Sequence, residues 1–324
     1  MSEPQEMGSI QVVEELRQGA LLGPAPAGGL HELLPDAGEV YATSSGWRLA
    51  WREYASNRLA VFALVLLVVI VLFCFLGPVF YHSNQTVANP LQQTEAPSAA
   101  HLLGTDQNGF DELGRLMLGG QSALEIGAYA SLVAIVIGTL YGAISGLVGG
   151  IVDALLMRIV DVLLSIPFLI VVLVLATKYN GTVLDISLVL GVFSWLVPSR
   201  LVRGEVLTLR TRDFVIAAQT MGAKRSRVIF RHLIPNAMSV TIVNVTFLIA
   251  DSILALAVLG FIGFGLQFPN VSWGDMLGNA QNYMEAGQWW LVFPVGGLLV
   301  VVVLCFNLIG DALRDAVDVR LRRR

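Results

Sequence analysis

The sequence predicts an all-α, polytopic membrane protein with six transmembrane helices. Composition, six long apolar runs and the placement of the basic residues each support this prediction. Of the 324 residues, 55% are hydrophobic and 14% are charged, whereas a typical soluble domain has about 25% charged residues. A soluble protein of this length needs a charged shell, and because too few charges are present here, much of the apolar surface must face lipid.

The six apolar runs are each long enough to cross a bilayer. The first, residues 59–80, has 22 residues without a charge, enough for a hydrocarbon core of about 30 Å. It is too long and too far from residue 1 for a signal peptide, so we expect a retained anchor. Each run is apolar on all sides, which favours spanning over surface-lying helices. The other runs are residues 122–148, 154–177, 183–202, 237–266 and 289–309.

The basic residues predict the orientation. With the N-terminus in the cytosol, 18 of the 20 Lys and Arg fall in or beside inside segments, and only Arg115 and Lys178 fall outside. The positive-inside rule therefore selects an N-in, C-in topology. The inside segments are then residues 1–58, 149–153, 203–236 and 310–324.

The flanking segments are polar. Residues 1–44 carry seven acids and one base, Arg17, which predicts a disordered tail, with a short helix near residues 10–22 as the alternative. Residues 45–58 mix aromatic side chains with arginines, as in a helix lying at the cytosolic interface. The predicted organisation is an acidic tail (1–44), an interfacial amphipathic helix (45–58), the first span and an extracytoplasmic loop (59–121), a transmembrane core (122–311) containing the cytosolic loop 203–236, and a basic cytosolic C-terminus (312–324).

The outer loop ends in a Gly-rich stretch. Asp106, Asn108 and Asp111 are spaced somewhat like calcium ligands, but the required Gly and distal Glu are missing. We expect a turn in which Asp111 caps a short helix leading into the second span.

The loop 203–236 predicts two short helices. Asp213 can cap the first, and small side chains at Ala217 and Ala218 allow another surface to approach closely. Gly222 suits the left-handed turn that ends this helix, and Ser226 can cap the second. The hairpin is basic, and on composition alone it could equally be an ordinary positive-inside loop.

Spacing connects this loop to a known family. It resembles the EAA loop of bacterial ABC importer permeases, in which Glu-Ala-Ala is followed by Gly four residues later and by Leu-Pro about twelve residues further on. Ala217, Ala218, Gly222 and Pro235 stand at those positions, and Ile216 replaces the Glu. In that family the loop forms a coupling helix that docks in a groove of the ATPase subunit. The resemblance therefore implies ATPase coupling by Ala217, Ala218, Gly222, Ala223, Lys224, Arg225, Arg227 and Pro235.

Further stretches resemble the same family, in order, from about Trp47 to Arg322. The chain is similar to the second, C-type permease of dipeptide and oligopeptide importers, a group that also contains nickel and glutathione systems. Three positions depart from the pattern: Leu102 and Val319 stand where relatives have Pro, and Phe110 where they have Arg. The matching stretches are residues 101–116, 157–167, 199–215, 259–265, 272–277 and 306–322.

The resemblance implies a type I ABC importer membrane domain in the cytoplasmic (inner) membrane of a prokaryote. Expected partners are a homologous second permease, two ABC ATPase subunits, an extracytoplasmic substrate-binding protein and membrane lipid. No GxxxxGK[ST] motif occurs in the chain, so we expect a non-catalytic subunit without a cofactor of its own, with ATP and Mg²⁺ held by the ATPases. The implied substrates are di- or oligopeptides, with nickel, glutathione or another small solute as the alternative.

Two groups of polar residues inside the spans need an explanation. Asp251 lies mid-span, where a carboxylate costs about 2.5–3.5 kcal/mol on insertion scales. It either lines the translocation path with Asn244, meeting the peptide amino group, or hydrogen-bonds to a neighbouring helix or subunit. Arg158 and Asp161, three residues apart, are expected to form a structural ion pair. Nearby charged residues, Arg200, Arg203 and Glu205, are expected to brace the cytosolic loop.

Other functional classes have less support. An intramembrane hydrolase could pair Asp251 with Asp311, but HExxH and GxSxG are missing from the sequence. An ion-coupled secondary transporter would need an internal repeat, and none is evident. The four histidines show no ligand spacing, which predicts no metal site. Transport that stops without ATP while ion gradients persist would separate an ABC importer from both alternatives.

Overall fold

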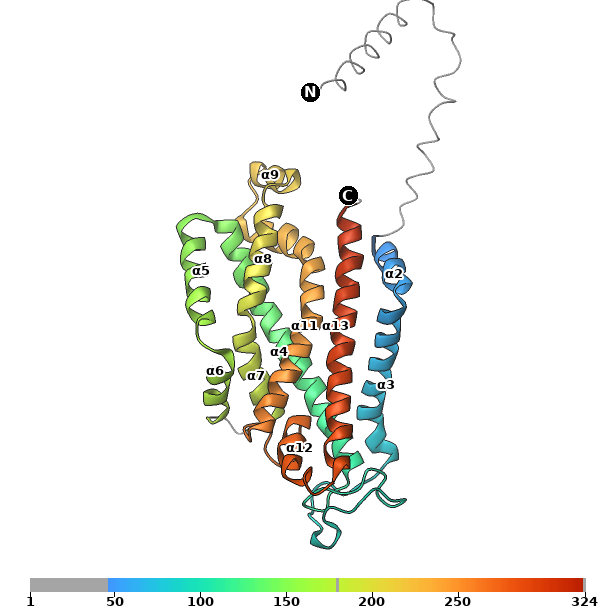
Figure 1. Ribbon diagram of the computed structural model, residues 1–324. Coiled ribbons are helices and arrows are strands. Elements are labelled where there is room, and N and C mark those ends of the chain that lie inside the picture. The colour runs from blue at the N-terminus through green and yellow to red at the C-terminus, as the bar shows by residue number, and fades with distance from the viewer. Residues whose placement is uncertain (1–45, 179–180, 323–324) are drawn as a thin grey trace, which may run out of the picture. The chain divides into compact units, whose positions relative to one another are not determined.

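The computed structural model describes residues 46–178 and 181–322, and all regular elements in these ranges are helical (Figure 1). The predicted acidic tail, residues 1–44, lies outside the described residues. Within the segment predicted to form an interfacial helix, α2 (Gly46–Ser56) is helical. The last helix, α13 (Phe293–Arg322), continues without a break through the predicted boundary at residue 312.

Four stretches are long and apolar enough to cross a membrane alone. They are α3 (Arg58–Phe80), α4 (Glu112–Val148), α13 with the turn before it, and α11 (Ile234–Phe261) together with α10 (Arg225–Val228) and a π-helical turn between them. Two further pairs qualify only jointly, so the described residues contain up to six spans. The pairs are α5 (Gly150–Leu164) with α6 (Phe168–Ala176), and α7 (Val183–Ser194) with α8 (Leu196–Leu209).

Both pairs are bent, which corrects the uninterrupted runs expected from hydropathy. The first pair bends by 74° just before α6 and the second by 43° at Trp195. Pro167 disfavours a helical residue before it. Pro198 has no N–H, so the carbonyl of Ser194 loses its usual donor four residues later. Apolar side chains continue through both bends, and hydropathy alone therefore does not reveal them.

Helix α4 runs obliquely through the bundle and packs most extensively on α8 (Figure 1). Gly138, Gly142 and Gly146 face α8 at four-residue intervals, so the two backbones come close together. A Cβ added to Gly142 would lie 2.4 Å from the carbonyl oxygen of Ser199. The two helices are therefore in close backbone contact along this stretch.

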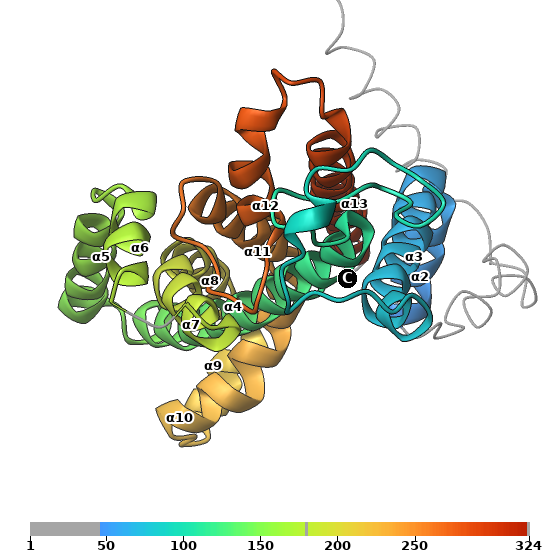
Figure 2. The same ribbon diagram turned by 90° about the horizontal axis from the view of Figure 1, so that it is seen from below.

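Different segments of the chain lie at the two ends of the bundle. At one end, the hairpin end, lie α2, α9 (Asp213–Thr220), α10 and the end of α13; at the other, the loop end, lie residues 81–111 and α12 (Trp273–Ala280) (Figure 1). Figure 2 shows α5 and α6 at one flank and α2 and α3 at the opposite flank. Among the described residues, α2, the loop 203–236 and the end of α13, which the basic residues predict to share one side of the membrane, lie at one end.

At the loop end Asp111 ties three segments together. Its Oδ1 accepts the N–H of Gly114 at 2.8 Å, which confirms the predicted cap, although the capped helix is the long α4 itself. Its Oδ2 accepts the hydroxyl of Tyr81 at 2.7 Å and lies 2.8 Å from Nδ1 of His101. Burial, and then the hydrogen bond with Asp111, raises the pKa of Tyr81 to about 12, so the phenol remains a donor.

Helix α12 closes the same end. Its Trp273 is almost fully buried and donates from Nε1 to the carbonyl of Leu116 at 2.9 Å. Ser272 and Asp275 form a capping box at its start. The predicted span 237–266 is therefore too long, because α11 ends at Phe261 and the chain turns back into α12.

Candidate functional site

A hairpin made of α9, α10 and the turn between them protrudes at the hairpin end (Figure 1). Its inner face has a small apolar core of its own, which packs against α4 and α8. The hairpin is therefore attached to α4 and α8. The buried residues are Val215, Val228, Ile229 and Leu233 of the hairpin region, with Ala143 of α4 and Val202 and Val206 of α8.

The turn of the hairpin follows the prediction. Gly222 has φ +80°, a left-handed conformation that favours glycine. The N–H of Ala223 donates to the carbonyl of Ala218 and that of Gly222 to the carbonyl of Gln219, which closes α9.

The predicted caps of the hairpin helices are wrong. Arg212 is the N-cap residue of α9 without a side-chain hydrogen bond, and Asp213 is its first helical residue. Lys224, in extended conformation, precedes α10, and Ser226 lies inside that helix. The second helix is also not a separate short element, because α10 continues through the π-helical turn into α11, where Pro235 occupies the first turn.

The hairpin presents basic and apolar side chains together. Of the predicted coupling residues, Ala218 is buried and Ala223 half-buried, while Ala217, Gly222, Lys224, Arg225, Arg227 and Pro235 are exposed. Sequence reasoning missed four exposed apolar side chains here: Phe214, Ile216, Met221 and Phe230. Met221 is 82% exposed. Apolar groups bounded by charges on a protruding element are typical of a protein-docking surface.

Ion pairs join α8 to α5 beside the hairpin. Arg203 binds Asp153 through two contacts, Nε to Oδ1 at 2.5 Å and Nη2 to Oδ2 at 2.6 Å, and Ser145 donates to the same carboxylate. Arg210 donates to the carbonyl of Gly146 at 3.0 Å. These contacts hold the start of α5 and the end of α4 against the helix that leads into the hairpin.

The predicted pair of Arg158 with Asp161 is wrong. Asp161 pairs with Arg200 of α8 instead, and Arg158 is exposed without an ion pair to any described residue. The three-residue spacing along α5 would allow Arg158 to reach Asp161, but α8 lies close enough for Arg200 to pair with Asp161 instead. Arg200 and Arg203 thus pair with acids of α5, and neither side chain forms a hydrogen bond or ion pair with a described residue of the hairpin.

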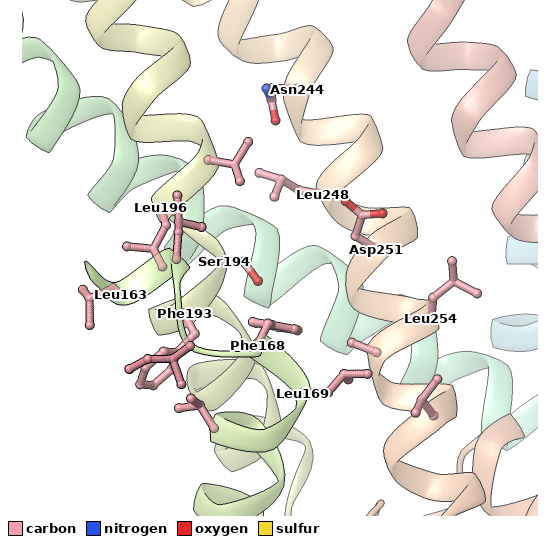
Figure 3. A pocket seen from close by; sticks show the side chains of 16 residues that line it. Leu163, Phe168, Leu169, Phe193, Ser194, Leu196, Asn244, Leu248, Asp251 and Leu254 are labelled. Atoms are coloured by element: carbon pink, nitrogen blue, oxygen red, sulfur yellow. The ribbon is translucent and has the colours of Figure 1, made fainter. Parts of the chain in front are cut away.

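A cavity of about 500 Å³ lies among α5, α6, α7, α8 and α11 (Figure 3). Both helix bends open into it. Three polar side chains line it, from Ser194, Asn244 and Asp251, and the other walls are apolar. The apolar lining consists of Leu163, Leu164, Ile166, Phe168, Leu169, Val171, Phe193, Leu196, Val197, Leu248, Leu254, Ala255 and Val258.

Asp251 and Asn244 project from the same side of α11 into this cavity, two turns apart (Figure 3). The Asp251 carboxylate is exposed, and no other described residue donates a hydrogen bond to it or pairs with it. The structure thus brings together the two residues predicted to line a path. Sequence reasoning missed Ser194. The signal that could have found it is Pro198, which lies four residues later in the same apolar run and predicts a bend there.

Comparison with known proteins agrees with these features. Residues 138–323 match the family described as "Binding-protein-dependent transport system inner membrane component", and residues 45–97 match "N-terminal TM domain of oligopeptide transport permease C". The chain is 41% identical over 274 residues to the oligopeptide transport system permease protein OppC of Escherichia coli K12, covering 84% of this chain and 90% of the relative.

Two relatives from other bacteria agree. A dipeptide transport system permease protein, DppC, of Alkalihalophilus pseudofirmus is 33% identical, with 89% of this chain and 94% of the relative covered. OppC of Bacillus subtilis is 35% identical, with 86% and 90% covered. The chain therefore belongs to the family of binding-protein-dependent transport system inner membrane components, as a multi-pass permease subunit of the cytoplasmic membrane.

Proposed function

We propose that this chain is one of two permease subunits of an ATP-driven importer of di- and oligopeptides. The relatives named above are oligopeptide and dipeptide permeases. The observation that carries the proposal is the protruding hairpin, whose exposed apolar and basic face is joined by a buried core to α4 and α8.

In this proposal the hairpin lies in the cytosol and docks on an ATPase subunit. Movement of that subunit on binding ATP displaces the hairpin, and the shared apolar core passes the displacement to α8 and α4. Helix α4 has 37 residues, or about 55 Å at 1.5 Å per residue, so it reaches the loop end. One displacement can therefore alter both ends of a path through the cavity.

The proposed complex contains a homologous second permease, two ATPase subunits and an extracytoplasmic substrate-binding protein. ATP and Mg²⁺ act in the ATPase subunits, and this chain is non-catalytic. The second permease faces the open side of the cavity, so that Asp251 and Asn244 line a shared path. The binding protein docks at the loop end.

Peptides fit the cavity better than a metal ion. A nickel path would offer several nitrogen, sulfur or oxygen ligands, whereas the lining of this cavity combines one carboxylate with extensive apolar surface. Apolar walls accept varied side chains without demanding a particular one. Other small organic solutes remain the alternative, and uptake measurements on the complete complex decide between them.

The docking proposal is tested by Met221→Asp, with Met221→Leu as matched control. Aspartate introduces a charge on the most exposed apolar side chain of the hairpin, so we expect the ATPase subunits to be lost from the purified complex and ATP-dependent peptide uptake to fall by at least tenfold. The leucine variant should retain both. If Met221→Asp copurifies with the ATPases and transports normally, this face of the hairpin is not the docking surface.

A further inference from the structure

We propose that the cavity contains a cation subsite, formed by Asp251 and the backbone carbonyl of Ser194, that receives an ammonium group of the transported solute. The group is the ammonium of a lysine side chain of the peptide. The inference rests on the proposed function, because it takes the cavity to be part of the path.

Charge in the cavity is confined to one residue. Among the side chains that line it, Asp251 alone is ionisable. Its carboxylate has no donor among residues 46–178 and 181–322 of this chain, whereas Asp106 and Asp153 each pair with an arginine. Asn244, on the same face of α11, adds an amide oxygen that can accept a further hydrogen bond (Figure 3).

The bend between α7 and α8 supplies a second acceptor. Because residue 198 is proline, the carbonyl of Ser194 has no donor at the usual position, and no other backbone N–H replaces it across the bend. The carboxyl end of α7 also carries partial negative charge. Ser194 lines the cavity, and its side chain points toward α11, which bears Asp251 (Figure 3).

These features together suit one class of group. A free carboxylate and an unpaired carbonyl are hydrogen-bond acceptors only, so they favour a donor with positive charge. Broken helices at membrane depth are tolerated where they line a cavity, and their free backbone groups bind ions or charged substrate groups in other transporters. The apolar walls accept the remaining side chains of the peptide.

The experiment uses the complete transporter in proteoliposomes with saturating binding protein. Uptake is compared for two tripeptides that differ only in a central lysine or glutamate, chosen so that the binding protein holds both equally well. The wild-type complex should transport the lysine peptide faster. Asp251→Asn should reduce this preference by about tenfold, the ratio that corresponds to about 1.4 kcal/mol, while Asp251→Glu should retain it.

Two controls identify the cause. Leu254→Asn changes polarity one turn away in the same cavity without removing a charge, and it should leave the preference unchanged. Pro198→Ala restores an N–H to the Ser194 carbonyl and should weaken the preference by a smaller factor. If Asp251→Asn yields too little complex, the Asp251→Cys variant can be modified with cationic and anionic thiol reagents of equal size.

The outcomes separate the two proposals. An unchanged lysine preference in active Asp251→Asn complex, or equal effects of cationic and anionic reagents on the cysteine variant, overturns the subsite. Failure of the wild-type complex to take up any peptide overturns the proposed function instead.

Discussion

Two carboxylates at different depths show how this protein uses polar groups. Asp111, at the loop end, is 4% exposed and is held by Gly114, Tyr81 and His101. Asp251, in the cavity, is exposed and has no partner among the described residues of its own chain. The paired carboxylate of Asp111 joins three segments. The unpaired carboxylate of Asp251 can still accept hydrogen bonds from a solute or from a neighbouring subunit.

Two ion pairs extend this contrast. Asp153 and Arg203 near the hairpin, and Asp106 and Arg115 near the loop end, form pairs that are largely shielded from solvent. Such groups are expected to affect stability when altered, whereas Asp251 is expected to affect transport alone. Three measurements test this division, from the largest expected effect to the smallest.

The largest effect is expected for Asp153→Ala. Removing one partner of a buried pair leaves the other charge uncompensated, at about 3–5 kcal/mol, and because the Arg203 side chain is 32% exposed we expect the lower end of this range. The readout is thermal unfolding of the purified complex, together with its amount in membranes. The double variant Asp153→Ala/Arg203→Ala should recover part of the loss. Equal stability of the single variant and the wild type would contradict a structural role for the pair.

A smaller loss is expected for Asp111→Ala, which removes the cap of α4 and the partner of Tyr81 and His101. A cap contributes about 1 kcal/mol and each further hydrogen bond about 1 kcal/mol, so we expect a loss of about 2–3 kcal/mol in thermal or denaturant unfolding. Asp251→Asn serves as the comparison and should unfold at the wild-type temperature. A comparable loss in both variants would show that Asp251 is structural too.

The smallest effect concerns the pH dependence of stability through Asp275. Burial raises the pKa of this carboxyl despite its hydrogen bonds from Ser272 and Leu266. The folded state therefore holds the proton more tightly than the unfolded state, whose value is about 3.9. The contribution to stability is complete below that value and is lost as pH rises through the higher folded value.

The unfolding temperature should therefore fall over this acidic interval, and Asp275→Asn should make the fall less steep. Unfolding in detergent measured in steps across the interval gives the slope for each protein. Ser272→Ala removes the hydroxyl that donates to this carboxyl and accepts from the Asp275 N–H, so it should raise the pKa of Asp275 further and make the fall steeper. An identical slope in Asp275→Asn and wild type would show that another group causes the pH dependence of stability.

Sequence reasoning succeeded where local chemistry decides the structure. The apolar runs located the four stretches that can span a membrane alone and the two bent pairs, because a bilayer requires length and hydrophobicity of each segment independently. Gly222 and Asp111 were predicted correctly because a left-handed turn and an N-cap each depend on a few neighbouring residues. The caps at Asp213 and Ser226 were wrong because more than one residue nearby could precede the helix.

The sequence by itself thus determined the membrane class, the positions of the spans and the turn of the hairpin. Tertiary structure alone decided that Arg200 takes Asp161, that α4 contacts α8 through glycines, and that two bent spans enclose a cavity with Asp251. The physical reason is distance along the chain. Partners dozens of residues apart meet only after helices have packed, and no periodicity within one helix specifies which face a distant helix will cover.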